Sequence, residues 1–109
     1  MVDLIKTVNT VVGEEYGRAA AKFGPTNNSD HESFGILLEE YEEARYEDVA
    51  FSKAADNFWN LIKENADDSE KMDELNSMFH SAICAACEWI QVAAMAYKAQ
   101  KTIEERNQQ

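Results

Sequence analysis

The chain has 109 residues and a formal net charge of −11, because 21 acidic residues face only 10 basic ones. This length limits it to a single domain over residues 1–109 with one modest core. Lysine and arginine occur singly along the chain. Phosphate backbones need clustered positive charge, so the composition argues against a nucleic-acid partner.

Membrane and export signals are not expected in this sequence. We find no stretch near the ~20 apolar residues of a membrane span, and the N-terminus lacks the basic and apolar regions of an export signal. Cys84 and Cys87 lie three residues apart, which is not typical of a secreted disulfide framework. These features predict a soluble, cytoplasmic protein with reduced thiols and no membrane partner.

Apolar residues at helical spacing predict a first helix from Val2 to Phe23. Gly24 and Pro25 follow, and this pair ends helices because glycine accepts the left-handed conformation and proline cannot continue the helix. Thr26 opens the loop that comes next.

A second helix is predicted to begin at Ser29, whose hydroxyl and the side chain of Glu32 form the capping-box pattern. Beyond it, core positions alternate four and three residues apart: Leu37, Tyr41, Ala44, Asp48, Phe51, Ala55, Phe58 and Ile62. This pattern favours one long helix to about Asn65. A break near Asp48, which would give two shorter helices, is the alternative.

The last helix is predicted from about Glu70 to Glu105, with Asp67, Asp68 or Ser69 as its cap. Residues from Arg106 onward are expected to fray. The middle of this helix is rich in alanine, at positions 82, 85, 86, 93, 94, 96 and 99. Small residues allow helix backbones to approach closely, so we predict that this helix is central.

The predicted fold is therefore an all-α bundle of three to four long antiparallel helices. Helices of this length on so short a chain leave an apolar stripe uncovered. We therefore expect the bundle to be completed in a homodimer or a higher homo-oligomer.

Two acidic pairs carry most of the chemistry in the sequence. Glu40 and Glu43 lie three residues apart, so both carboxylates point to one face of the second helix. Glu88 and Gln91 repeat this spacing on the last helix. Facing pairs of this kind supply the hard oxygen ligands that Mg²⁺ prefers beside a phosphate. A solvated acidic surface is the alternative interpretation of the first pair.

Glu88 lies in the most apolar segment of the chain, where a carboxylate is expected to need a partner. Lys98 follows it on the same stripe, and it is placed either to meet an anion or to lie as an ordinary surface lysine. His31, at the start of the second helix, is either a ligand contact or an exposed histidine. His80, Cys84 and Cys87 share a face, but a buried pair of reduced thiols is favoured over a zinc site.

Glu39-Glu40-Tyr41-Glu42-Glu43 and Glu88-Trp89-Ile90-Gln91 resemble the EExxE and ExxD motifs of the MazG-like nucleoside-triphosphate pyrophosphohydrolases. The first motif matches as it stands, whereas Gln91 replaces the aspartate of the second. The stretches KFGPTNNSDHESFGILLEEYEE and CEWIQVAAMAYKA also look like small proteins of phages and Gram-positive bacteria that are grouped with this family. The resemblance covers nearly the whole chain.

The resemblance implies Glu40, Glu43 and Glu88 as ligands of Mg²⁺ or Mn²⁺, with Glu39 as a supporting group or base. Gln91 can offer a carbonyl oxygen to the metal but no charge. The implied activity is hydrolysis of a nucleoside triphosphate to the monophosphate and pyrophosphate. Because of Gln91, a catalytically degenerate protein that sequesters a nucleotide is a second hypothesis. A helical interaction module whose acidic face docks on a basic partner is the third.

Overall fold

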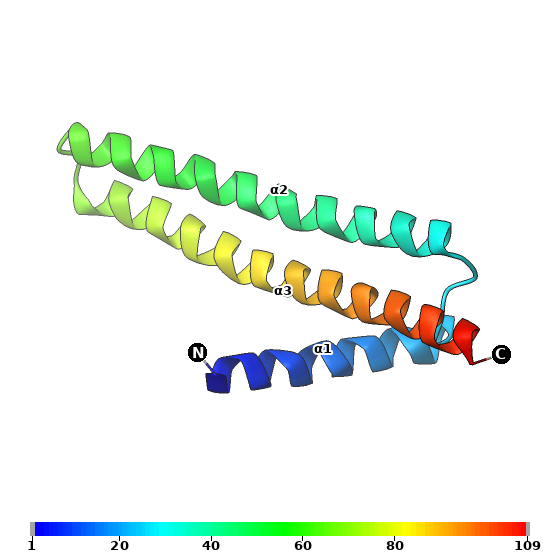
Figure 1. Cartoon of the computed structure of the whole chain (residues 1–109). Coiled ribbons are helices and arrows are strands. Elements are labelled where there is room, and N and C mark those ends of the chain that lie inside the picture. Colours follow the sequence, from blue (N-terminus) through cyan, green and yellow to red (C-terminus); the bar gives the residue numbers. More distant parts are fainter. Residues whose placement is uncertain (1, 109) are drawn as a thin grey trace.

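The computed structural model of the protein describes residues 2–108, which form three helices and no strand. They are α1 (Val2–Phe23), α2 (Asp30–Lys63) and α3 (Asp68–Asn107). The predicted all-α fold is confirmed, and α2 runs without a break, so the number of helices is three. Figure 1 shows that α2 and α3 form a long antiparallel hairpin, while α1 runs alongside the C-terminal half of α3.

The predicted signals between α1 and α2 are largely confirmed. Gly24 has φ +93°, and its N–H donates to the Ala20 carbonyl at 2.9 Å, which closes α1. The Glu32 N–H donates to the Ser29 hydroxyl at 3.1 Å. The return contact differs from the capping box by one residue, because the Glu32 carboxylate accepts from the backbone N–H of Asn28 at 3.4 Å and from its side-chain amide at 3.1 Å.

The ends of α3 extend beyond the prediction by two residues on each side. Asp67 is the cap, with its carboxylate accepting the Glu70 N–H at 2.9 Å. The expectation of fraying is wrong for Arg106 and residue 107, which are helical. The physical reason is an ion pair between the Arg106 guanidinium and Asp30 at 3.0 Å, which joins the end of α3 to the start of α2. Residue 109 lies outside the described part of the chain.

The prediction that the last helix is central is confirmed. Both α1 and α2 pack against α3, and they do not contact each other. Ala44 and Ala94 are completely buried and Ala54 is nearly so, while no large side chain is fully buried among residues 2–108. The helices are therefore joined by close approach of small side chains.

The molecule is markedly elongated. Its radius of gyration is 18.5 Å, whereas a compact domain of this length has about 13 Å. Its extents are 65 × 30 × 22 Å. A shape of this kind leaves many large apolar side chains exposed, from Leu4 near the N-terminus to Ile103 near the C-terminus.

Helix α3 is long and apolar enough to cross a membrane by length and composition. This corrects the expectation that no stretch comes near that limit. Only 11 % of the apolar window is buried within the structure, and α3 carries Glu88 and Lys98 in its apolar middle.

Along part of α2, the buried positions are shifted by one residue from the predicted core stripe. Tyr41, Asp48 and Ile62 belong to the predicted stripe but are exposed, whereas Glu40 and Glu47 are partly buried. The partly or fully buried positions of α2 include Ser33, Leu37, Glu40, Ala44, Glu47, Ala54, Phe58 and Leu61. Close contact at the small residues sets this register, and it turns two glutamates toward α3.

One buried contact ties the connection between α1 and α2 to the central helix. The backbone N–H of Asn27 donates to the Thr102 hydroxyl at 2.9 Å, and the Asn27 side-chain amide donates to the Ser33 hydroxyl at 2.8 Å. Both Asn27 and Thr102 are buried. This contact positions the loop beside the C-terminal end of α3.

We expect Thr102→Val to lower the free energy of unfolding by about 1–3 kcal/mol, because it leaves the buried Asn27 N–H without an acceptor. Urea denaturation followed by circular dichroism measures this change. Thr10→Val is the matched control. The Thr10 hydroxyl lies on the surface and donates to the carbonyl four residues earlier in its helix. The control should stay within about 0.5 kcal/mol of the parent. Equal losses in the two variants would show that the Asn27 contact contributes nothing.

Candidate metal centre

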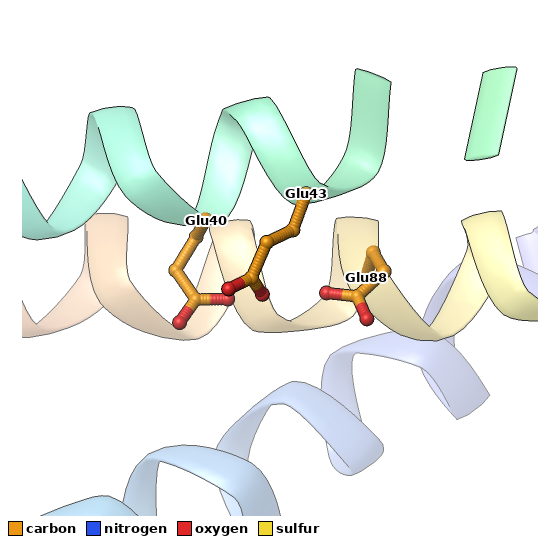
Figure 2. Close-up of side chains that lie close together, drawn as sticks. All are labelled: Glu40, Glu43 and Glu88. Carbon is orange, nitrogen blue, oxygen red and sulfur yellow. The ribbon is translucent and has the colours of Figure 1, made fainter. Parts of the chain in front are cut away.

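Three glutamates from two helices converge at one place. Glu40 and Glu43 extend from α2 and Glu88 from α3, and one carboxylate oxygen from each lies within 4.8 Å of the others. Figure 2 shows the three carboxylates lying together across the front of the α2–α3 seam. Glu40 and Glu88 are partly buried and Glu43 is exposed. We call these three residues the glutamate trio.

The trio carries uncompensated negative charge. Burial, followed by the charges of Glu43 and Glu88, raises the pKa of Glu40 above its usual range. Burial, together with the neighbouring charges of Glu43 and Glu47, likewise raises the pKa of Glu88. None of the four ion pairs formed within residues 2–108 includes a member of the trio. Such a cluster is relieved only by taking up protons or by binding a cation.

The geometry of the trio is close to what a small divalent cation requires. Mg²⁺ takes six oxygen ligands at about 2.1 Å, so the ligand oxygens of an octahedral site lie about 3.0–4.2 Å apart. Separations of up to 4.8 Å need only small side-chain rotations to reach these values. Three carboxylates also leave positions for water or phosphate oxygens, which Mg²⁺ usually retains.

Gln91 lies one turn after Glu88 but is held by a residue of α1. Its side-chain amide donates to the Glu15 carboxylate at 2.7 Å. Hydrogen bonds from Arg18 and then from Gln91 lower the pKa of Glu15. The amide nitrogen of Gln91 is therefore occupied, which leaves its carbonyl oxygen as the atom available to a cation. Glu15 was missed by the sequence analysis, because a contact between residues 76 positions apart leaves no local pattern.

The other predicted site residues lie farther from the trio. Lys98 is only 5 % exposed and takes part in none of the ion pairs of the described chain. It follows Glu88 by ten residues, or about 15 Å along the helix axis. His31 is exposed in the first turn of α2, about 14 Å before Glu40 along its axis. Glu39 is exposed and outside the trio, although its charge contributes to raising the pKa of Glu40.

The histidine–cysteine group does not form a second metal site within residues 2–108. The Cys84 sulfur lies 3.5 Å from His80 Nε2, and both cysteines are free. The prediction of a buried thiol pair is wrong for Cys87, which is exposed. Burial and the charge of Glu47 raise the pKa of the Cys84 thiol, so this group stays protonated.

The trio therefore brings carboxylate oxygens from two facing helices of the bundle to one place. No family model matches the chain, and comparisons with curated proteins and with solved structures also give no match.

The raised pKa values of Glu40 and Glu88 predict a pH-dependent stability. Above the ordinary glutamate pKa of about 4.3, Glu40 and Glu88 hold more protons in the folded state than in the unfolded state, so their contribution to the free energy of unfolding falls as the pH rises. We expect the free energy of unfolding of the Glu88→Gln variant to fall less over this pH window than that of the parent protein. Urea denaturation in metal-free buffers at a series of pH values measures the difference. Glu42→Gln, an exposed neighbour outside the trio, should follow the parent. The pKa argument fails if both variants behave alike.

Proposed function

We propose that the protein binds Mg²⁺ or Mn²⁺ through Glu40, Glu43 and Glu88 and uses this cation to hold the phosphates of a nucleoside triphosphate. The nucleotide is then hydrolysed to the monophosphate and pyrophosphate. The observation that carries the proposal is the convergence of three carboxylates from two helices within 4.8 Å. The resemblance of both motifs to the MazG-like family supports the same activity. We propose that the protein acts in a reducing, cytoplasmic setting.

The charge of the protein explains why a cation is required. A chain with a net charge of −11 repels a polyanionic nucleotide. Glu40, Glu43 and Glu88 would hold a divalent ion, which would offset most of their negative charge and supply a positive charge for phosphate oxygens. Lys98, which is 5 % exposed, follows Glu88 towards the C-terminus of α3. At about 15 Å from Glu88 along the axis, it would meet a part of the nucleotide remote from the cation.

In the proposed reaction, water attacks the α-phosphorus and its oxygen forms the new bond. The bond between the α-phosphorus and the oxygen bridging to the β-phosphorus breaks, and pyrophosphate leaves with that oxygen. The water loses a proton, and we assign Glu39, which precedes Glu40 in the sequence, as the group that accepts it. A cation held by Glu40, Glu43 and Glu88 would supply Lewis-acid chemistry, by which a bound water becomes more acidic and charge on phosphate oxygens is stabilised.

A second candidate function is binding without hydrolysis. It is favoured by the hydrogen bond between Gln91 and Glu15, because Gln91 supplies no charge and its amide is already held. A site with three carboxylates instead of four binds its cation more weakly. Such a protein would retain a nucleotide intact.

Mg²⁺ should raise the free energy of unfolding, by about 2.7 kcal/mol at a concentration one hundred times the dissociation constant. Thermal denaturation with and without Mg²⁺ or Mn²⁺ measures this effect. Glu43→Gln and Glu88→Gln should lose most of the response, whereas Glu42→Gln should keep it. Full retention of the response in both trio variants would place the cation elsewhere.

Incubation with a panel of nucleotides and Mg²⁺, followed by chromatography of the free and bound fractions, distinguishes the two functions. Hydrolysis predicts monophosphate and pyrophosphate in the free fraction. It also predicts that Glu88→Gln lowers turnover by at least about 100-fold, because the loss of a residue that only supports a metal ligand already lowers activity by up to about 100-fold. Sequestration predicts unchanged nucleotide in the bound fraction. If neither product nor bound nucleotide appears with any member of the panel, both functions are wrong.

Gln91→Asp tests the departure from the motif. On its own it sets a carboxylate beside Glu15, and this repulsion opposes the benefit of a fourth acidic ligand. We therefore expect the double variant Glu15→Gln with Gln91→Asp to gain more Mg²⁺ affinity than Gln91→Asp alone. Titration calorimetry with Mg²⁺ measures the order. Unchanged affinity in both would show that Gln91 does not adjoin the cation.

A further inference from the structure

The hydrogen bond from Gln91 to Glu15 is the only one that joins side chains of α1 and α3 within residues 2–108. The Gln91 amide nitrogen lies 2.7 Å from one carboxylate oxygen of Glu15, and the contact is partly buried. The guanidinium of Arg18, one turn later in α1, binds the other oxygen of the same carboxylate. Glu15 is therefore held from two sides, by its own helix and by α3.

The charge of Glu15 determines which end of the Gln91 amide faces α1. Hydrogen bonds from Arg18 and then from Gln91 lower the pKa of Glu15, so its carboxylate stays ionised and can only accept hydrogen bonds. The NH₂ group of Gln91 must then face Glu15. The carbonyl oxygen of Gln91 accepts no hydrogen bond within the described chain. It is therefore free to face another group.

The nearest group on α3 that could use this oxygen is the glutamate trio. Gln91 lies one turn after Glu88, so the two side chains share a face, and both are partly buried. A carbonyl oxygen carries partial negative charge, which is disfavoured beside three carboxylates and favoured beside a cation that they hold. The contact with Glu15 thus keeps Gln91 in the orientation that suits a loaded site.

Helix α1 depends on few other contacts for its position. None of its residues is buried, and α3 is the only helix of the described chain that it packs against. Next to Glu15, the ring of Tyr16 meets that of Tyr97 edge to face with centroids 4.8 Å apart. The hydrogen bond from Gln91 is therefore the one polar side-chain contact that docks α1 on α3.

We propose that Glu15 is a positioning residue, which holds Gln91 so that its carbonyl oxygen completes the cation site of the glutamate trio. Docking of α1 and binding of the cation then reinforce each other, because each stabilises the same orientation of Gln91. The affinity of the site thereby depends on a helix that contributes no ligand to it. This inference rests on the proposed function in requiring that the trio binds a divalent cation.

Titration of the full chain with Mg²⁺ in a calorimeter tests the positioning role. Glu15→Ala removes the acceptor of the Gln91 amide, so it should weaken Mg²⁺ binding about 10- to 100-fold, as the loss of a group that orients a metal ligand does. Glu15→Gln retains a carbonyl acceptor and should keep most of the affinity. Glu14→Ala is the matched control, because Glu14 has the same charge and is the exposed neighbour of Glu15.

The control should bind Mg²⁺ as tightly as the parent protein. Unchanged affinity in Glu15→Ala would overturn the proposal. Losses of equal size in Glu15→Ala and Glu15→Gln, or in Glu15→Ala and Glu14→Ala, would overturn it too, because they would assign the effect to charge instead of the hydrogen bond.

A cycle with Gln91→Ala separates positioning from a general loss of structure. If Glu15 acts through Gln91, Glu15→Ala should cause no further loss of Mg²⁺ affinity in the Gln91→Ala background. A further loss as large as in the parent background would give Glu15 a role independent of Gln91 and contradict the proposal.

Hydrogen exchange of the parent protein, followed by mass spectrometry, needs no substitution. Saturating Mg²⁺ should slow amide exchange in α1 as well as around the trio, although α1 contains no member of the trio. Slower exchange in α2 and α3 with α1 unchanged would overturn the coupling and leave the cation site in place. No change in any helix, together with no heat of Mg²⁺ binding, would instead contradict the proposed function and this inference with it.

Discussion

The close packing of α2 against α3 through small side chains is the contact on which the other features depend. Ala44 and Ala54 of α2 are buried, as is Ser81 of α3. Small residues allow only a narrow range of registers, because a shift replaces an alanine with a larger neighbour. A slip of one turn would move one helix by about 5.4 Å along the other. That distance would separate Glu88 from the two glutamates of α2, so the register of the hairpin creates the trio.

Two acidic groups on adjoining parts of the same bundle are treated in opposite ways. Glu15 is partnered by Arg18 and Gln91, and its pKa is lowered. Glu40 and Glu88 have no cationic partner in the ion pairs of the described chain, and burial raises the pKa of each. Retaining a partly buried cluster without a counter-charge costs stability. That cost is the physical argument for a bound cation, and it distinguishes the trio from the other acidic residues of this strongly negative protein.

Helix α3 must satisfy several neighbours at once, which explains its unusual composition. One face meets α2, a second meets α1 near Gln91 and Tyr97, and a third leaves large apolar side chains such as Phe79 exposed. A helix that is apolar on most of its circumference is typical of the centre of a bundle. The same property makes α3 resemble a membrane-spanning segment by composition. Glu88 and Lys98 in its middle are suited to a bundle interior, where polar partners and ligands are within reach.

The helices and their ends could be predicted from the sequence because they depend on neighbours a few residues away. The bounds of α1, the cap Ser29 and the left-handed glycine after α1 follow from local hydrogen bonding and backbone sterics. Asp67 was one of three candidate caps, and α3 extends two residues beyond the predicted helix at each end. The shared face of Glu40 and Glu43 follows from helical periodicity alone. The sequence therefore determined which side chains each helix presents together.

Only the tertiary structure decided which of these faces meet. The seam on α2 takes in Glu40 and Glu47 and leaves Tyr41 and Ile62 exposed, because small residues and not the largest apolar ones set the contact. The bonds from Gln91 to Glu15 and from Arg106 to Asp30 join residues 76 positions apart. Contacts at that separation depend on the packing of whole helices, so the local periodicity of the sequence does not reveal them.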